Sequence, residues 1–181
     1  MKKTPLIFNR NPENMDEVLQ THNELCSWVF NGEGVATRKY DGTSCLVKDG
    51  SLWKRREVKK GKPMPEGFVS AGSDGFTGKT VGWLPVTDSG SDKWHVEAFG
   101  DGGLADGTYE LCGPKVQGNP EGYSRHILVP HSGSETYEVQ ERSFDGIKRF
   151  ISGLDIEGIV FHHEDGRMAK IRKSDYNLGR N

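Results

Sequence analysis

Residues 34–58, GVATRKYDGTSCLVKDGSLWKRREV, constrain the fold of this chain more than any other stretch. Runs rich in β-branched and aromatic residues alternate here with turn sequences, and Asp49-Gly50 is a typical hairpin turn. The stretch therefore predicts three strands. Further strands are expected in WHVEAF and GTYELCG, and DIEGIVFHHEDGRMAKIRK predicts a second hairpin that turns at residues 164–166.

Two helices complete the expected pattern. Asn11-Pro12 is a helix-start signal followed by apolar residues at roughly helical spacing, which predicts a helix over about 12–29. The segment RSFDGIKRFISG has one apolar helical face and ends at Gly153, a favourable C-cap. Residues 60–93 are rich in Gly, Pro and Ser, which indicates long loops. Together these elements predict an α+β domain of antiparallel β-sheets with flanking helices.

Length and composition narrow the class of protein. A chain of 181 residues suits a single domain, and its 24 glycines favour turns and loops over a helical bundle. The net charge of −2 excludes a polycation, so any nucleic-acid surface must come from local clustering. The three cysteines are widely spaced, which argues against a disulfide framework and against a zinc site. No apolar run is long enough to cross a bilayer and no signal peptide is visible, so we expect a cytoplasmic or nuclear protein without a membrane, in the host cytoplasm if the source is viral.

Two basic features stand close together in the first third of the chain. Lys39-Tyr40-Asp41-Gly42 places a lysine at the mouth of a turn, although an Asp-Gly turn beside a surface lysine would give the same pattern. The run 54–62, KRREVKKGK, holds six basic residues and one acid, and it is either a solvated face or a surface for polyphosphate or RNA.

Strand alternation divides the basic run between two faces. Trp53 and Arg55 share one face of the expected strand, and Lys54 and Arg56 share the other. Only one pair can therefore line a pocket together with Lys39, and the sequence leaves open which one.

Four charged positions follow on later strands. Glu110 lies in the middle of an otherwise buriable strand, where a carboxylate needs a partner or a hydroxyl to bind unless that strand face is exposed. Glu157 precedes a glycine and the apolar run IVF. Lys170 and Arg172 share a strand face about 7 Å apart, which lets two cations flank one phosphate, although cross-strand pairing with Glu157 would explain the pattern too.

The order and spacing of these stretches resemble the motifs of the covalent nucleotidyltransferases, which include polynucleotide ligases and mRNA capping enzymes. The resemblance is strongest to the compact 5′–3′ RNA ligases, through ATRKYDGT, LWKRR, GWLPV, GNPEGY, LVPHS and IEGIVFHHEDG, and it covers about residues 35–175. It implies a nucleotidyltransferase (ATP-grasp-like) ligase catalytic domain over residues 1–181, without an accessory C-terminal domain.

The resemblance also implies an activity. An ATP-dependent RNA ligase joins 5′-phosphate and 3′-hydroxyl RNA ends through a covalent lysyl-AMP intermediate, with ATP and Mg²⁺ (or Mn²⁺) as cofactors. By resemblance Lys39 is the nucleophile, and Lys170 and Arg172 are the cations that favour its neutral amine and take up charge on the α-phosphate. We expect a monomer whose partners are ATP and RNA.

The remaining roles follow from the same motifs. Glu110 is implied as the acceptor of a ribose hydroxyl, and Arg55, or else Arg56, as a contact to the ribose or the RNA end. Asp41 and Glu157 are implied to hold water molecules on the metal. The other implied nucleotide-binding residues are Arg38, Gly42 and Val160.

Two departures from the family pattern leave alternatives open. Arg172 stands where many ligases have a lysine, and it keeps the charge. No aromatic residue stands where adenine is often stacked, and Ile127 and Leu128 are the aliphatic candidates. The alternatives to an RNA ligase are a DNA ligase, a capping-type guanylyltransferase, and a non-catalytic module that binds RNA ends or nucleotides.

Overall fold

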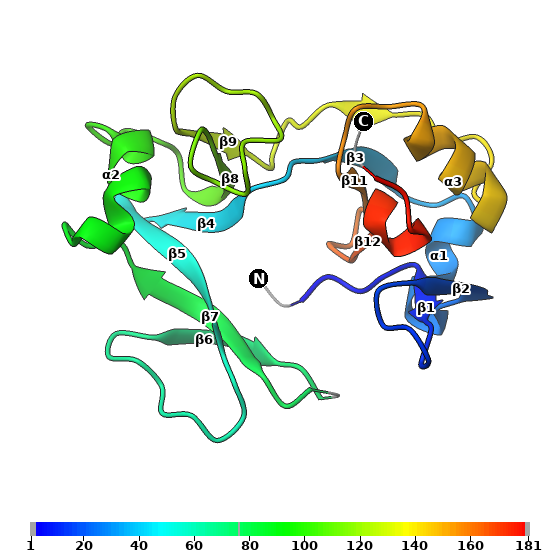
Figure 1. Cartoon of the computed structure of the whole chain (residues 1–181), viewed down its shortest axis with the longest axis horizontal. Coiled ribbons are helices and arrows are strands. Elements are labelled where there is room, and N and C mark those ends of the chain that lie inside the picture. The colour runs from blue at the N-terminus through cyan, green and yellow to red at the C-terminus, as the bar shows by residue number, and fades with distance from the viewer. Residues whose placement is uncertain (1–2, 76, 180–181) are drawn as a thin grey trace. The chain divides into compact units, whose positions relative to one another are not determined.

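The computed structural model describes residues 3–75 and 77–179, and the chain divides into two compact units (Figure 1). The middle unit consists of Met1–Lys3 and Asp41–Gly133, and the terminal unit consists of Thr4–Tyr40 and Ser134–Asn181. The ladders between named strands are antiparallel in the described residues, so the chain is a mixed α+β protein with few helices, as expected. The single nucleotidyltransferase domain over residues 1–181 stays a prediction.

The terminal unit contains a four-stranded sheet in the order β10-β3-β11-β12 and a two-stranded sheet of β1 and β2. Its elements are β1 (Phe8–Arg10), β2 (Val18–His22), the 3₁₀ turn η1 (Glu24–Cys26), α1 (Ser27–Phe30), β3 (Val35–Lys39), β10 (Thr136–Tyr137), α3 (Phe144–Ser152), β11 (Gly158–His162), β12 (Met168–Arg172) and the 3₁₀ turn η3 (Lys173–Tyr176).

The core of the terminal unit lies between α3 and one face of the four-stranded sheet. Ile147 and Ile151 from α3 are fully buried, as are Ile159 and Phe161 from β11. The helix forms where the sequence predicts it, and the side chain of Ser143 caps its first turn by accepting a hydrogen bond from the backbone. One face of the sheet is thus buried, and the opposite face is left for polar residues.

The helix expected over 12–29 is wrong except at its end, where α1 forms. The side chains of Asn11 and Asn14 each accept a hydrogen bond from the backbone N–H two residues on. Such side-chain turns compete with a helix. The segment that follows becomes strand β2, which pairs with β1.

The middle unit contains a six-stranded sheet in the order β6-β7-β5-β4-β8-β9. Its elements are β4 (Thr43–Lys48), β5 (Ser51–Val58), β6 (Val69–Ser73), β7 (Thr80–Pro85), the 3₁₀ turn η2 (Gly90–Asp92), α2 (Lys93–Phe99), β8 (Gly107–Cys112) and β9 (Ile127–Pro130). The three strands predicted between residues 34 and 58 are confirmed as β3, β4 and β5, and Asp49-Gly50 turns the β4–β5 hairpin with both residues at positive φ.

Two expectations for the middle unit are wrong. WHVEAF forms helix α2, because Trp94 and Ala98 lie one helical turn apart and pack together with Phe99 against the core of this unit. The stretch 60–93, expected as loops, contains β6 and β7, which pair with each other while β7 also pairs with β5. Gly72 and Gly82 lie inside these two strands, so the glycine content of the stretch did not indicate loops there.

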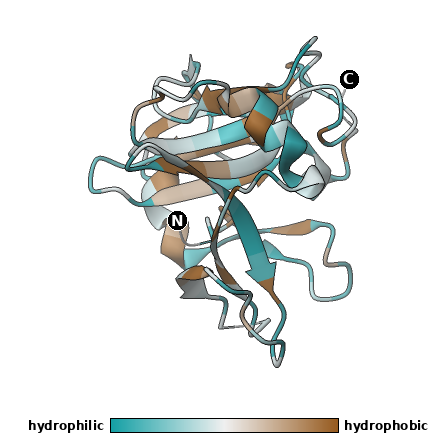
Figure 2. Ribbon diagram, turned by 90° about the vertical axis from the view of Figure 1, so that its left-hand side faces the viewer, coloured by the Kyte–Doolittle hydropathy of each residue, from teal (hydrophilic) through white to brown (hydrophobic). Residues whose placement is uncertain are grey.

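Burial alternates along β12, where Ala169 and Ile171 are buried between partly exposed residues. Figure 2 shows hydrophobic and hydrophilic residues interspersed along the strands. Cys26, Cys45 and Cys112 are buried, and none of the three forms a disulfide. No helix in residues 3–75 or 77–179 has the length and apolar character needed to cross a membrane.

Candidate active site

Five of the predicted site residues come together on the terminal sheet. Lys39 lies opposite Gly158, which in turn lies opposite Arg172. Val160 lies opposite Lys170 in the neighbouring row. Because directly opposite residues of an antiparallel ladder point to the same face, these side chains share the face turned away from the core. We call this surface, together with Glu157 at its end, the lysine face.

The Lys39 amine forms an ion pair with the carboxylate of Glu157, 118 positions later in the sequence. It also donates a hydrogen bond to the carbonyl oxygen of Tyr40 at 3.3 Å. Both ion-pair partners are about one-fifth exposed, at 21% and 19% of their side-chain surface. The amine is thus fixed at the end of a rigid strand instead of extending into solvent.

The surroundings of Lys170 lower the pKa of its amine to about 8. Burial is the largest cause, and the positive charges of Lys39 and Arg172 act in the same direction, against the opposing carboxylates of Glu157 and Asp175. A cation at this position is therefore electrostatically coupled to the Lys39 amine, as neighbouring charges of the same sign require.

Arg172 is held by a carboxylate that the sequence did not reveal. The Asp175 side chain is fully buried and accepts hydrogen bonds from Nη2 and Nε of Arg172 at 2.7 and 3.1 Å, and from its backbone N–H at 2.9 Å. This fork of parallel contacts fixes the plane of the guanidinium. Spacing alone could not have found Asp175, because its side chain turns back onto the preceding strand through η3.

Gly158 explains why the lysine face can be so compact. A Cβ atom at this position would lie 2.2 Å from the carbonyl oxygen of Ile171 and 2.7 Å from the Cα of Arg172. The absence of a side chain also leaves nothing between Lys39 and Arg172 on the intervening strand.

Gly158→Ala is therefore expected to lower the free energy of unfolding by about 2 kcal/mol, since β11 and β12 must separate to admit the methyl group. Urea denaturation of the two proteins measures the effect. Gly153→Ala is the matched control, because its Cβ would meet only the Phe150 carbonyl oxygen, at 3.7 Å. Equal stabilities for both variants would contradict the role of close packing.

Arg38 does not belong to the lysine face. Its side chain lies on the other side of β3, where it contacts the carboxylate of Glu135 at 3.7 Å and the ring of Tyr40 at 5.0 Å from the centroid. Its backbone N–H donates to the carbonyl oxygen of Glu135.

The middle unit carries Arg55 and Glu110 on the sheet face opposite its core. Cys45 is buried in the core and pairs with Lys54 on one side and Tyr109 on the other. The next residues along these strands, Arg55 and Glu110, therefore share the opposite face. Arg55 thus lies on the face of Glu110, where its guanidinium packs over the Trp83 ring at 5.2 Å and burial lowers its pKa.

The rest of the basic run is divided as strand alternation predicts. Arg56 lies on the face opposite Arg55, and Lys54 forms an ion pair with the buried Asp92. Lys59, Lys60 and Lys62 are exposed. The two aliphatic candidates separate in the same way, since Leu128 packs in the core and its neighbour Ile127 does not.

Glu110 is oriented by a histidine. His131 places Nε2 3.0 Å from Oε2 of Glu110 and Nδ1 2.9 Å from the hydroxyl of Thr108. Glu110 is only 8% exposed, and its other oxygen makes no hydrogen bond within the described part of the chain. We define Arg55, Glu110 and His131 as the glutamate face. The sequence offered no signal for His131, whose position depends on the pairing of β8 with β9.

Asp41 and Gly42 begin the middle unit. The backbone N–H of Asp41 donates to the Glu121 carboxylate at 2.9 Å. A Cβ on Gly42 would lie 2.2 Å from the carbonyl oxygen of Leu111 and 2.9 Å from Cγ of Glu110. The glycine therefore lets the chain pass directly beside the strand that carries Glu110.

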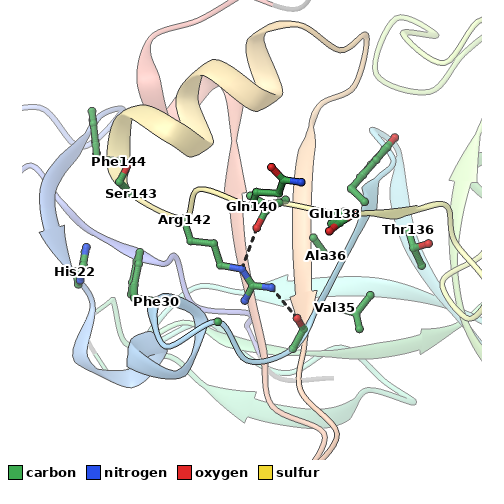
Figure 3. Close-up of a pocket in the computed structure, with 14 residues that line it drawn as sticks. His22, Phe30, Val35, Ala36, Thr136, Glu138, Gln140, Arg142, Ser143 and Phe144 are labelled. Carbon is green, nitrogen blue, oxygen red and sulfur yellow. Dashed lines mark hydrogen bonds between the residues drawn. The ribbon is translucent and has the colours of Figure 1, made fainter.

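A pocket of about 790 Å³ occurs elsewhere in the terminal unit (Figure 3). The predicted site residues do not line it. Arg142 lines this pocket. It donates hydrogen bonds to the carbonyl oxygens of Val29 and Gly34 at 3.0 Å and to that of Glu33. Arg142 is therefore engaged in closing the chain around the end of α1.

Comparisons with known proteins agree with the resemblance that the motifs indicated. No family model matches the chain. It is 26% identical to RNA ligase 1 of Rattus norvegicus, over 83% of this chain and 69% of that protein. The RNA ligase 1 of Mus musculus is also 26% identical, over 83% of this chain and 68% of its own length. The chain is therefore similar, at low identity, to the RNA ligase 1 proteins over most of its length.

Proposed function

We propose that this chain is an ATP-dependent RNA ligase that joins 5′-phosphate and 3′-hydroxyl ends through a lysyl-AMP intermediate, on a nucleotidyltransferase fold. The observation that carries the proposal is the placement of the Lys39 amine on one sheet face with two further cations, Lys170 and Arg172. The similarity to RNA ligase 1 proteins supports RNA as the substrate.

In the first step the Lys39 nitrogen forms a bond to the α-phosphorus of ATP, the bond from that phosphorus to the pyrophosphate oxygen breaks, and the amine gives up a proton. Glu157 orients the amine through the ion pair. Lys170 and Arg172 would stabilise the negative charge that develops on the phosphate. AMP then passes to the 5′-phosphate of RNA, and attack by a 3′-hydroxyl releases it.

Glu157 fits a site for Mg²⁺ that is held mainly through water. Mg²⁺ binds through one or two carboxylates and keeps several water molecules. Among the described residues, no group of three or more His, Cys, Asp or Glu side chains could hold a metal ion by itself. Glu157 would hold the ion through water. Asp41 is the other carboxylate to which the motif resemblance gives this role. The bound ion would supply positive charge to the phosphates.

In the middle unit, Glu110 is the residue for a ribose hydroxyl. One carboxylate oxygen is held by His131, so the other remains oriented for a hydroxyl donor. Arg55 on the same face would contact the ribose or an RNA phosphate.

His131→Ala is expected to raise the KM for ATP about fivefold with little change in kcat, since the carboxylate loses its orienting partner but no group at the phosphorus changes. Steady-state ligation at varied ATP measures both constants. The control is His163→Ala, a histidine of the terminal unit that contacts Glu33 and Asp165. A fall in kcat at unchanged KM would contradict this assignment.

The proposal is tested by incubating the protein with α-labelled ATP and Mg²⁺ and then adding 5′-phosphorylated RNA. Label should appear on the polypeptide and leave it when the RNA is added. Labelling from GTP instead would indicate a capping-type enzyme, and discharge only onto nicked DNA would indicate a DNA ligase. Thermal stabilisation by ATP without any covalent label, under Mg²⁺ or Mn²⁺, would indicate a binding module and refute the proposal.

A further inference from the structure

Two arginines of the terminal unit share one buried carboxylate. Besides its fork with Arg172, Asp175 lies 3.3 Å from Nη1 of Arg10, the last residue of β1. The Asp175 side chain has no exposed surface, whereas Arg10 and Arg172 each keep about 30% of theirs exposed. The carboxylate therefore forms the floor of the cluster, and the two guanidinium groups extend from it toward solvent.

The charges of this cluster do not balance. Both guanidinium groups stay protonated at any physiological pH, so two positive charges meet one negative charge. Lys170 adds a further cation, and the positive charge of Arg172 contributes to the lowered pKa of its amine. An excess of fixed positive charge at a partly exposed site favours an anionic ligand.

The N-terminal segment is built to bring Arg10 to this place. Lys170 donates its backbone N–H to the carbonyl oxygen of Pro5 at 2.9 Å, and the N–H of Ile7 donates to the carbonyl oxygen of Lys170 at 3.1 Å. Ile7 and the next residue, Phe8, are anchored in the core. Arg10 is thus tied to the strand that carries the cations of the lysine face.

Arg10 also has N–H groups that are available to a ligand. Its Nη1 makes both of its contacts, to Asp175 and to the Met15 carbonyl oxygen at 2.7 Å. Its Nε and Nη2 make no hydrogen bond to any residue that the structure describes. This pair of N–H donors on one edge of the guanidinium matches the spacing of two phosphate oxygens.

We propose that Arg10 binds phosphate next to the lysine face, with Asp175 positioning Arg10 and Arg172 side by side. The inference rests on the proposed function, where phosphates come either from the ATP tail or from the RNA 5′ end. Arg10 would hold the phosphate beside the one that reacts at Lys39. A structural ion pair that only fastens β1 to η3 would give the same contacts, so the test must separate binding from stability.

The experiment is calorimetric titration of the full chain with three probes: inorganic tripolyphosphate, a short 5′-phosphorylated RNA, and the same RNA with a 5′-hydroxyl. Arg10→Gln should weaken binding of at least one phosphorylated probe about tenfold, the loss of one charge-assisted contact. Arg10→Lys keeps the charge, so its loss of binding free energy should be less than half of the loss in Arg10→Gln. The matched control is Arg149→Gln, whose side chain is 74% exposed on α3 and should bind as wild type.

The probes identify the source of the phosphate. A loss confined to tripolyphosphate assigns Arg10 to the ATP tail, and a loss confined to 5′-phosphorylated RNA assigns it to the RNA end. Equal binding by Arg10→Gln and wild type would overturn the inference, as would an equal loss in Arg149→Gln or no binding of any phosphorylated probe by the wild type. A lower melting temperature with unchanged affinity would identify a structural ion pair and overturn it too.

The measurement is independent of catalysis. Arg10-dependent binding without lysyl-AMP formation would keep this inference and remove the ligase proposal. Normal lysyl-AMP formation, together with binding that does not depend on Arg10, would keep the ligase proposal and remove this inference.

Discussion

Lys39→Ala is expected to abolish covalent labelling by α-labelled ATP completely. In the proposed mechanism the intermediate forms on the Lys39 amine, which Glu157 and the end of β3 hold in place. Loss of a covalent nucleophile removes the intermediate itself and not merely a few kilocalories of stabilisation. Gel analysis of the labelled protein measures the result.

The control is Lys48→Ala, which removes an exposed lysine at the end of β4 and should label like the wild type. Thermal stabilisation by ATP in Lys39→Ala would show that the variant is folded and still binds nucleotide. Residual label above background on the folded variant would place the nucleophile elsewhere in the chain.

Lys170→Met is expected to inactivate the protein and stabilise it. Methionine fills the volume of the lysine stem but removes the charge, so labelling should fall by a factor of about 100 or more. Near pH 7 the free energy of unfolding should rise by about 1 kcal/mol, because folding no longer buries a cation beside Lys39 and Arg172. Active sites commonly trade stability for activity in this way.

The lowered pKa of Lys170 determines how the stability difference between Lys170→Met and the wild type changes with pH. The unfolded lysine titrates near 10.5, whereas the folded group titrates near 8. Between these values the unfolded wild-type chain binds more protons than the folded protein, so wild-type stability rises with pH. The advantage of Lys170→Met is therefore full below pH 8 and shrinks as the pH rises toward about 10.5. Urea denaturation at pH 7 and pH 9.5, with Lys48→Met as a pH-independent control, measures it, and a growing advantage at pH 9.5 would contradict the assignment.

Part of the lysine face could be read from the sequence because it depends on local rules, whereas Lys39 joins it through the long-range pairing of β3 with β11. Lys170 and Arg172 share a face through strand alternation, and the β11–β12 hairpin places Gly158 opposite Arg172. Which of Arg55 and Arg56 shares the face of Glu110 depended on the registers of β5 and β8 against β4, the strand between them, and these pairings left no local signal in the sequence.

The failures have physical causes of the same kind. The stretch WHVEAF fits a strand and a helix equally well by pattern, and only the core contacts of Trp94 and Ala98 decide for the helix. The helix expected over 12–29 does not form over most of that range, because the side chains of Asn11 and Asn14 accept hydrogen bonds from nearby backbone N–H groups and stabilise turns instead. His131 was missed because it reaches Glu110 only through the pairing of β8 with β9. Asp175 was missed because the turn η3, which carries it back onto Arg172, was not predicted.

The hydrogen bonds between Pro5, Ile7 and the backbone of Lys170 have a practical consequence for handling the protein. β12 is the last strand of its sheet, and these residues cover its outer edge. Trimming them off would leave an uncovered strand edge, which invites neighbouring molecules to pair with it and aggregate. Purification tags are therefore better placed after residue 181 than in exchange for the first ten residues.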